Sequence, residues 1–155
     1  ISMSFWLADN NIEFIEQPFK STNLSDTAQL KIKSPLPIIA DENSINASDI
    51  PKIENVFDGI NIKLMKCGSL FEAIKMVKMA RERDMQIMLG CMIESSVAIT
   101  AAAHISPLVD YADLDGNLLI NNDPYKGVTV DNGRLILPRT HGMGVSLIDN
   151  DTSLR

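Results

Sequence analysis

The stretch Asp58-Gly-Ile-Asn-Ile-Lys-Leu-Met-Lys-Cys-Gly68 is the one around which the rest of the chain is arranged. Its β-branched residues predict a strand, and alternation of side chains puts Asn61, Lys63 and Met65 on one face. If that face lines a crevice or a closed barrel, desolvation and neighbouring positive charge would lower the pKa of Lys63 and make it a proton acceptor. The alternative is an edge strand whose lysines are simply solvated.

Composition limits the class of protein and its partners. The 155 residues are 45% hydrophobic, which suits one domain with a core, and the net charge of −6 disfavours nucleic acid and anionic membranes as partners. No apolar run reaches the length that spans a membrane. Cys67 and Cys91 lack metal-like spacing, and no secretory signal precedes them, so we expect reduced thiols in a cytoplasmic protein. The opening residues resemble the last turns of a helix, and we expect the chain to be a fragment.

Five predicted strands alternate with helices at a spacing of roughly twenty-five residues, a pattern typical of βα units in a parallel sheet. The strands are expected at residues 12–18, 37–41, 58–66, 85–89 and 109–114, and the helices at residues 1–10, 24–33, 46–56, 69–83 and 95–105. After Asp115 the rhythm changes. The sequence Asp131-Asn-Gly133 predicts a hairpin turn between two short strands.

Polar residues follow every predicted strand, at the edge where the active sites of βα folds lie. Glu16 and Asp41 each follow apolar strand residues, so both should emerge beside Lys63. Two carboxylates suit a hard cation such as Mg²⁺, although a third ligand should come from water or from outside the chain. Asp113 and Asp115 stand two apart and could bind a metal or a substrate ammonium group. The alternative for each acid is that it caps the next helix or, at Asp115, belongs to a turn.

The two histidines give weaker signals. His104 lies late in an apolar helix, and we expect it to be packed rather than catalytic. His141 lies in a loop beside glycines, and we expect it to be exposed to solvent. Neither cysteine has a nearby histidine that would indicate a thiol nucleophile.

Five segments, in this order and spacing, resemble the enolase superfamily, its muconate-lactonizing subgroup and, most closely, the dipeptide epimerases. They are Glu16-Gln-Pro18, Pro37-Ile-Ile-Ala-Asp-Glu42, Asn61-Ile-Lys-Leu-Met-Lys-Cys-Gly68, Gly90-Cys-Met-Ile-Glu-Ser95 and Asp113-Leu-Asp-Gly116. The resemblance implies strands four to eight of a TIM-type (β/α)₈ barrel. Residues 1–127 would form this partial barrel, and residues 128–155 a β-hairpin tail returning toward a missing capping domain. A whole barrel takes roughly 250 residues, so this chain should not close one alone.

The resemblance also implies roles for the residues at the strand ends. Glu16 and Asp41 would bind Mg²⁺, and Lys63 would be the acid and base, with Lys66 the less suitable candidate. A further metal-binding aspartate and a partner lysine of the family would lie upstream of Ile1.

The substrate side of the site follows from the same resemblance. Asp113 and Asp115 would receive the α-ammonium group of a dipeptide. The seventh strand would line the pocket with Cys91, Met92 and Ile93.

The function implied is Mg²⁺-dependent epimerisation of dipeptides such as L-Ala-L-Glu, by removal and return of the α-proton. The intact protein would be an isomerase, and the chain alone is expected to be inactive. Its partners would be the dipeptide and either the missing N-terminal part or further copies of itself. The alternatives are another enzyme of the subgroup, namely an o-succinylbenzoate synthase, an N-acylamino acid racemase or a cycloisomerase, or a non-catalytic half-barrel.

Overall fold

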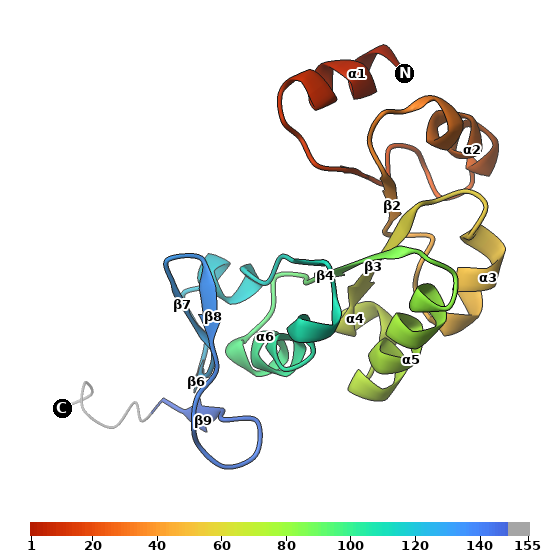
Figure 1. The fold of residues 1–155 in the computed structure, drawn as a ribbon. Coiled ribbons are helices and arrows are strands. Elements are labelled where there is room, and N and C mark those ends of the chain that lie inside the picture. Colours follow the sequence, from red (N-terminus) through yellow and green to blue (C-terminus); the bar gives the residue numbers. More distant parts are fainter. Residues whose placement is uncertain (149–155) are drawn as a thin grey trace.

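Five parallel strands form one curved sheet (Figure 1). The strands are β1 (Ile15–Glu16), β2 (Ile38–Ala40), β3 (Gly59–Lys63), β4 (Gln86–Gly90) and β5 (Tyr111–Ala112). Each strand is paired with the next one along the chain, and all of these pairings are parallel. The predicted α/β fold with consecutive strands of a partial barrel is therefore confirmed. The computed structural model describes residues 1–148.

The helices are α1 (Ser2–Asp9), α2 (Leu24–Lys33), η1 (Ala47–Asp49), α3 (Ile50–Ile53), α4 (Leu64–Cys67), α5 (Leu70–Arg81), α6 (Ser96–Ala103), η2 (Ser106–Leu108) and η3 (Gly116–Leu119). After α1, helices alternate with the strands, and α2, η1 and α5 begin at side-chain caps. The Ser69 hydroxyl caps α5 by accepting a hydrogen bond from the Glu72 N–H. Figure 1 shows α2, α3, α5 and α6 along the outer side of the curved sheet.

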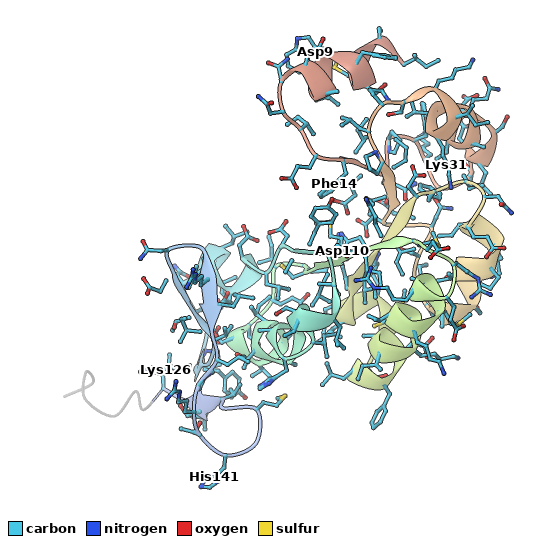
Figure 2. The ribbon with its side chains drawn as sticks, viewed as in Figure 1. Asp9, Phe14, Lys31, Asp110, Lys126 and His141 are labelled. Carbon is cyan, nitrogen blue, oxygen red and sulfur yellow. The ribbon has the colours of Figure 1, made fainter. Side chains whose placement is uncertain are left out.

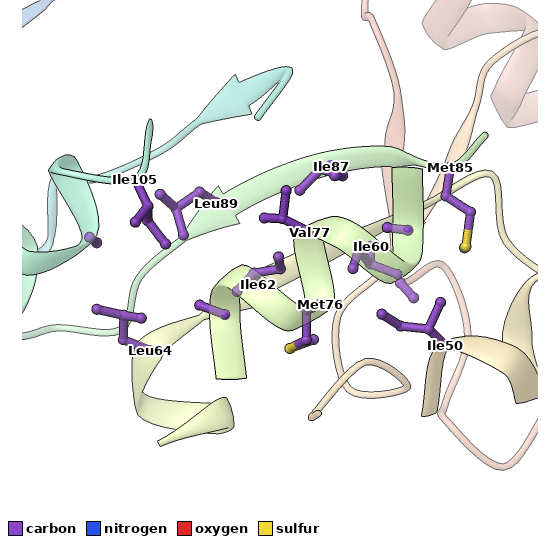
Figure 3. Close-up of a cluster of buried hydrophobic side chains, with 14 of the residues drawn as sticks. Ile50, Ile60, Ile62, Leu64, Met76, Val77, Met85, Ile87, Leu89 and Ile105 are labelled. Atoms are coloured by element: carbon purple, nitrogen blue, oxygen red, sulfur yellow. The ribbon is translucent and has the colours of Figure 1, made fainter. Parts of the chain in front are cut away.

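The two faces of the sheet carry different side chains. The outer face contributes alternate strand residues to the buried core, which Figure 3 shows in part: Ile38, Ala40, Ile60, Ile62, Ile87 and Leu89. From α5, Ala73, Met76, Val77 and Ala80 pack into the same core. Each large apolar side chain that is fully buried there contributes about 1.5–3 kcal/mol. Because side chains alternate along a strand, the residues between them, such as Asn61, face the inner, concave side.

The concave side is spanned by an aromatic contact between the two ends of the sheet. Phe14 precedes β1 and Tyr111 begins β5, and their ring centroids lie 4.7 Å apart at an interplanar angle of 48°. Figure 2 labels Phe14 in the hollow of the curve. Tilted aromatic pairs at this separation are favourable, so the contact helps to keep the sheet curved.

The strand predicted at residues 58–66 is shorter than expected. It ends at Lys63, and α4 forms a single helical turn that closes at Gly68, whose φ of 82° is left-handed. The Gly68 N–H donates to the Leu64 carbonyl at 2.8 Å, which satisfies the end of the turn. Met65 therefore does not share a strand face with Lys63, and it is 61% exposed. A helical turn places residues 63 and 66 on the same side, whereas a strand would place them on opposite sides.

The C-terminal tail contains β6 (Tyr125–Lys126), β7 (Thr129–Asp131), β8 (Arg134–Ile136) and β9 (Ser146–Leu147). β7 and β8 are antiparallel and flank a two-residue turn, so the predicted hairpin is confirmed. β6 pairs with β9, and the Val128 N–H donates to the Thr100 hydroxyl of α6 at 2.8 Å. A domain boundary between residues 127 and 128 stays a prediction, and residues 149–155 lie outside the described part. Within residues 1–148, no helix is both long and apolar enough to cross a membrane.

Candidate active site

Three predicted site residues meet at the carboxyl ends of neighbouring strands. Glu16 ends β1, Asp41 follows β2 and Lys63 ends β3. The Lys63 ammonium nitrogen lies 2.7 Å from Asp41 Oδ2 and 3.9 Å from Glu16 Oε1. The side chains of Lys63 and Asp41 are only 13% and 17% exposed, so this is a largely desolvated charge cluster rather than a solvated edge.

Lys66 joins the same cluster from α4. Its ammonium group donates to Asp41 Oδ1 at 2.5 Å, to the Asp41 carbonyl at 2.6 Å and to the Asn61 carbonyl at 3.0 Å. The prediction of an extended strand through residue 66 could not reveal this contact. The signal that could have done so is the spacing of three between the lysines, which matches one helical turn.

The charges in this cluster shift the pKa values of its members in different directions. Burial alone would raise the pKa of Asp41, but hydrogen bonds from Lys63 and Lys66 outweigh it and lower that pKa. Burial alone would lower the pKa of Lys63, but the hydrogen bond and charge of Asp41, with the charge of Glu16, outweigh it and raise that pKa. Burial lowers the pKa of Lys66 despite the Asp41 hydrogen bond, and the charge of Lys63 adds to this effect. The expectation of a lowered pKa at Lys63 is therefore wrong for this arrangement.

Two amide side chains hold the acidic residues in place. Asn61 Nδ2 donates to Glu16 Oε1 at 2.6 Å. The Asp41 N–H donates to Gln17 Oε1 at 2.9 Å, and Gln17 has a left-handed φ of 38°. Neither amide could be assigned a role from the sequence, because hydrogen bonds between strands cannot be inferred from residue type alone.

A second group of predicted site residues follows β4 and β5. Cys91 Sγ lies 4.0 Å from Asp115 Oδ1, and burial raises the pKa of the Cys91 thiol, with further contributions from the charges of Asp113, Asp115 and Glu94. Asp113 and Asp115 both lie beyond β5, which ends at Ala112, and Asp115 is the residue before η3. Met92 is 44% exposed.

Both groups lie at the same edge of the sheet. Lys63 is the register partner of Gly90, which directly precedes Cys91. Leu89 is the register partner of Ala112, which directly precedes Asp113. The other predicted pocket residue, Ile93, is 69% exposed at this edge.

The histidines lie elsewhere. His104 was expected to be packed, but it is exposed, because α6 ends just before it. Its Nε2 lies 3.1 Å from the Met143 carbonyl of the tail. His141 is exposed, as predicted, and Figure 2 shows it on the tail loop.

The chemistry of Glu16 and Asp41 suits a hard cation. Both offer carboxylate oxygens, which Mg²⁺ prefers, and Mg²⁺ is often held by one or two carboxylates with several waters. Contact with the same ammonium group shows that the two carboxylates converge on one positive charge. Among the described residues, no group of three or more His, Cys, Asp or Glu side chains could hold a metal. The residues present therefore fit part of a magnesium site.

The fold and these segments agree with the comparison to known families. A model of the enolase C-terminal domain-like family matches residues 1–151. The chain belongs to this family. An L-Ala-D/L-Glu epimerase from Bacteroides thetaiotaomicron is 49% identical over 148 residues, covering 96% of this chain and 39% of that protein. The chain thus spans well under half the length of this relative.

Solved structures of the enolase C-terminal domain-like family superpose closely on this chain. The substrate-liganded L-Ala-D/L-Glu epimerase from Bacillus subtilis matches with a TM-score of 0.86 at 29% identity, over 94% of this chain and 43% of that one. A dipeptide epimerase from Cytophaga hutchinsonii, complexed with Mg and the dipeptide D-Ala-L-Val, matches with a TM-score of 0.87 at 26% identity, over 97% of this chain and 43% of that one.

Proposed function

We propose that this chain supplies the Lys63 side of the active site of a Mg²⁺-dependent dipeptide epimerase. The observation that carries the proposal is the meeting of Lys63, Asp41 and Glu16 at the carboxyl edge of the sheet. The relatives named as dipeptide or L-Ala-D/L-Glu epimerases support the choice of reaction.

Glu16 and Asp41 would hold the metal ion. When bound, Mg²⁺ would withdraw electron density from the substrate carboxylate and so acidify the α-proton. The two carboxylates provide the negative charge that favours a divalent cation at this edge of the sheet, and the 31% exposure of the Glu16 side chain leaves room for the waters that Mg²⁺ keeps.

Lys63 would accept the α-proton of one epimer at Nζ and, in the reverse direction, donate a proton to the same face. It can accept the proton only when its amine is neutral, so the ion pair with Asp41 must weaken before the proton moves. The positive charge of Lys66, held beside it by three acceptors, favours loss of a proton from Lys63. Epimerisation requires a second acid on the opposite face of the α-carbon, and we expect that group outside this chain.

Asp113 and Asp115 would receive the α-ammonium group of the dipeptide. Both are exposed at the edge that carries Lys63, and neither has an ion-pair partner within residues 1–148. Carboxylates of this kind are well suited to charge-assisted hydrogen bonds from an ammonium ion. The half-buried Cys91 and the exposed Met92 and Ile93 would provide the apolar wall beside them.

The test is replacement of Lys63 in the full-length protein. We expect Lys63→Ala to lower kcat for L-Ala-L-Glu by about 10²–10⁴-fold, the usual contribution of a general acid or base. Deuterium incorporation at the α-carbon in D₂O, followed by NMR, measures the step directly. The matched control is Lys75→Ala, whose side chain is 62% exposed on α5. Unchanged epimerisation of L-Ala-L-Glu in Lys63→Ala would exclude the proposed role.

A further inference from the structure

Asn61 occupies a buried position next to the proposed metal-binding carboxylate. It lies in the middle of β3 and is 1% exposed. Its Nδ2 donates to Glu16 Oε1, while its backbone carbonyl accepts from Lys66 and from the Ser44 hydroxyl. The side chain thus links β3 to the end of β1 across the intervening strand.

Within residues 1–148, the side-chain oxygen of Asn61 has no hydrogen-bond partner. Oδ1 is buried and unpaired, which is unfavourable for a polar atom that was solvated in the unfolded chain. Rotation of the amide by 180° would not help, because Oδ1 would then face the negatively charged Glu16 carboxylate. The hydrogen bond to Glu16 therefore fixes the orientation of the amide, and in this orientation Oδ1 is left unpaired.

Gly90, at the end of the neighbouring strand β4, leaves the space that the Asn61 amide occupies. A Cβ atom at position 90 would lie 2.6 Å from Asn61 Oδ1 and 2.8 Å from Nδ2. Because these contacts are too short for any real side chain, the amide must lie flat against the bare backbone of Gly90. An alanine there would displace the end of the Asn61 side chain, which is more easily moved than the strand.

We propose that Asn61 is a positioning residue for Glu16, and that Gly90 holds it in place. By donating to Oε1, Asn61 would fix the rotation of the Glu16 carboxylate and leave Oε2 free to face the cation. This inference rests on the proposed function, in which Glu16 is a metal ligand. Asn61 itself acts through Glu16, since its amide nitrogen cannot coordinate a metal.

The variant Asn61→Leu can distinguish a positioning role of Asn61 from a purely structural one. Leucine has nearly the shape of asparagine but no polar atoms, so Asn61→Leu removes both the bond to Glu16 and the unpaired buried oxygen. The Glu16 side chain is 31% exposed, so water can replace the lost hydrogen bond, and loss of the unpaired buried oxygen offsets its removal. A positioning residue therefore predicts weaker metal binding in Asn61→Leu without a lower melting temperature.

The experiment is titration calorimetry of the full-length protein with Mg²⁺ alone, combined with thermal unfolding without metal. We expect Asn61→Leu to raise the Mg²⁺ dissociation constant by about 10–100-fold, the range for residues that orient metal ligands. Gly90→Ala, which keeps the Asn61 and Glu16 side chains but displaces the Asn61 amide, should also raise the Mg²⁺ dissociation constant. The Mg²⁺ concentration for half-maximal epimerisation should rise in both variants, with kcat recovering at saturating Mg²⁺. Asn55→Leu, at an exposed site, is the control and should bind as wild type does.

The outcomes distinguish the two proposals. Wild-type affinity in Asn61→Leu would overturn the positioning role while leaving the proposed function intact. If Asn61→Leu and Gly90→Ala both lose Mg²⁺ affinity and both also have a lower melting temperature, the role of Asn61 is structural. That result would likewise overturn the positioning role. Absence of Mg²⁺ binding by the wild-type protein would overturn the magnesium site, and the positioning role with it.

Discussion

Lys63 and Lys66 approach Asp41 from different elements, one from the end of a strand and one from a helical turn. Their position after predicted strands made Glu16, Asp41 and Lys63 candidates from the sequence, and the family resemblance implied their roles, whereas residue type alone left helix capping as an alternative for the acids. The contact made by Lys66 was not predicted, since it depends on where the strand ends. Nor was the Asn61 bond to Glu16, which depends on the alignment of strands that are not adjacent in sequence.

Asp113 and Asp115 allow a test of the substrate class at the level of single residues. Replacing both by asparagine in the full-length protein keeps their size and removes both negative charges. We expect dipeptide turnover to fall by about 100-fold or more, because the substrate ammonium group would lose its charged acceptors. Steady-state rates with L-Ala-L-Glu measure the effect.

An N-acylated amino acid provides the matched comparison for this double variant, because it has no free ammonium group. An enzyme of another branch of the family would turn over the N-acylated substrate and would be little affected by the two changes. Full dipeptide turnover in the double variant would contradict the assignment of Asp113 and Asp115.

At the scale of elements, the alternation of strands and helices was predictable, whereas their ends were not. Runs such as Ile38-Ile-Ala40 are buried on both faces and have a clear signal. The end of β3 instead depends on a left-handed Gly68 and on contacts of Lys66 with Asp41, which follows β2, and these contacts are tertiary. The predicted helix at residues 46–56 is likewise only η1 and α3, because the Asn46 and Asp49 capping box begins a short turn.

The Asp110 carboxylate connects three elements at the amino ends of the strands, away from the candidate site. Asp110, labelled in Figure 2, precedes β5. It accepts from Arg81 at the end of α5 at 2.7 Å and from the Ile87 N–H of β4 at 2.7 Å. The hydrogen bond from Arg81 lowers the pKa of Asp110, and burial, which would raise it, is the smaller effect. The pKa of Asp110 is therefore below its ordinary value.

This lowered pKa gives a stability prediction with a defined sign. A carboxyl whose pKa is lower in the folded state contributes stability above its unfolded pKa, near pH 4, and loses it as pH falls through the folded pKa. The free energy of unfolding should therefore be larger for wild type than for Asp110→Asn at pH 6, and the difference should shrink toward pH 2–3. Urea unfolding at each pH measures it. Asp9→Asn, on exposed α1, is the control. A difference that is constant across the pH range would contradict the prediction.

At the scale of the whole molecule, no strand among residues 1–148 pairs with the outer edges of β1 and β5. The chain carries two carboxylates and Lys63 at its candidate site, and the family resemblance implies a further metal-binding aspartate and a partner lysine beyond these three residues. The chain therefore holds only part of the proposed catalytic set.

We accordingly expect the 155-residue chain by itself to epimerise L-Ala-L-Glu in Mg²⁺ at a small fraction of the rate of the full-length protein, or not at all. Deuterium incorporation at the α-carbon provides the measurement, with the full-length protein under the same conditions as the reference. Incorporation at a comparable rate would mean that one lysine and two carboxylates suffice.

The contact between Phe14 and Tyr111 has a consequence for the order in which the molecule folds. Because the strands lie in the sheet in chain order, each pairing can form as soon as the next βα unit is made, and loop closure stays short at every step. The aromatic pair joins the first strand to the last, so it can form only after β5 has docked. Its appearance marks the completion of the sheet, and Tyr111 fluorescence during refolding of a variant without Trp6 and Tyr125 should report the final kinetic phase.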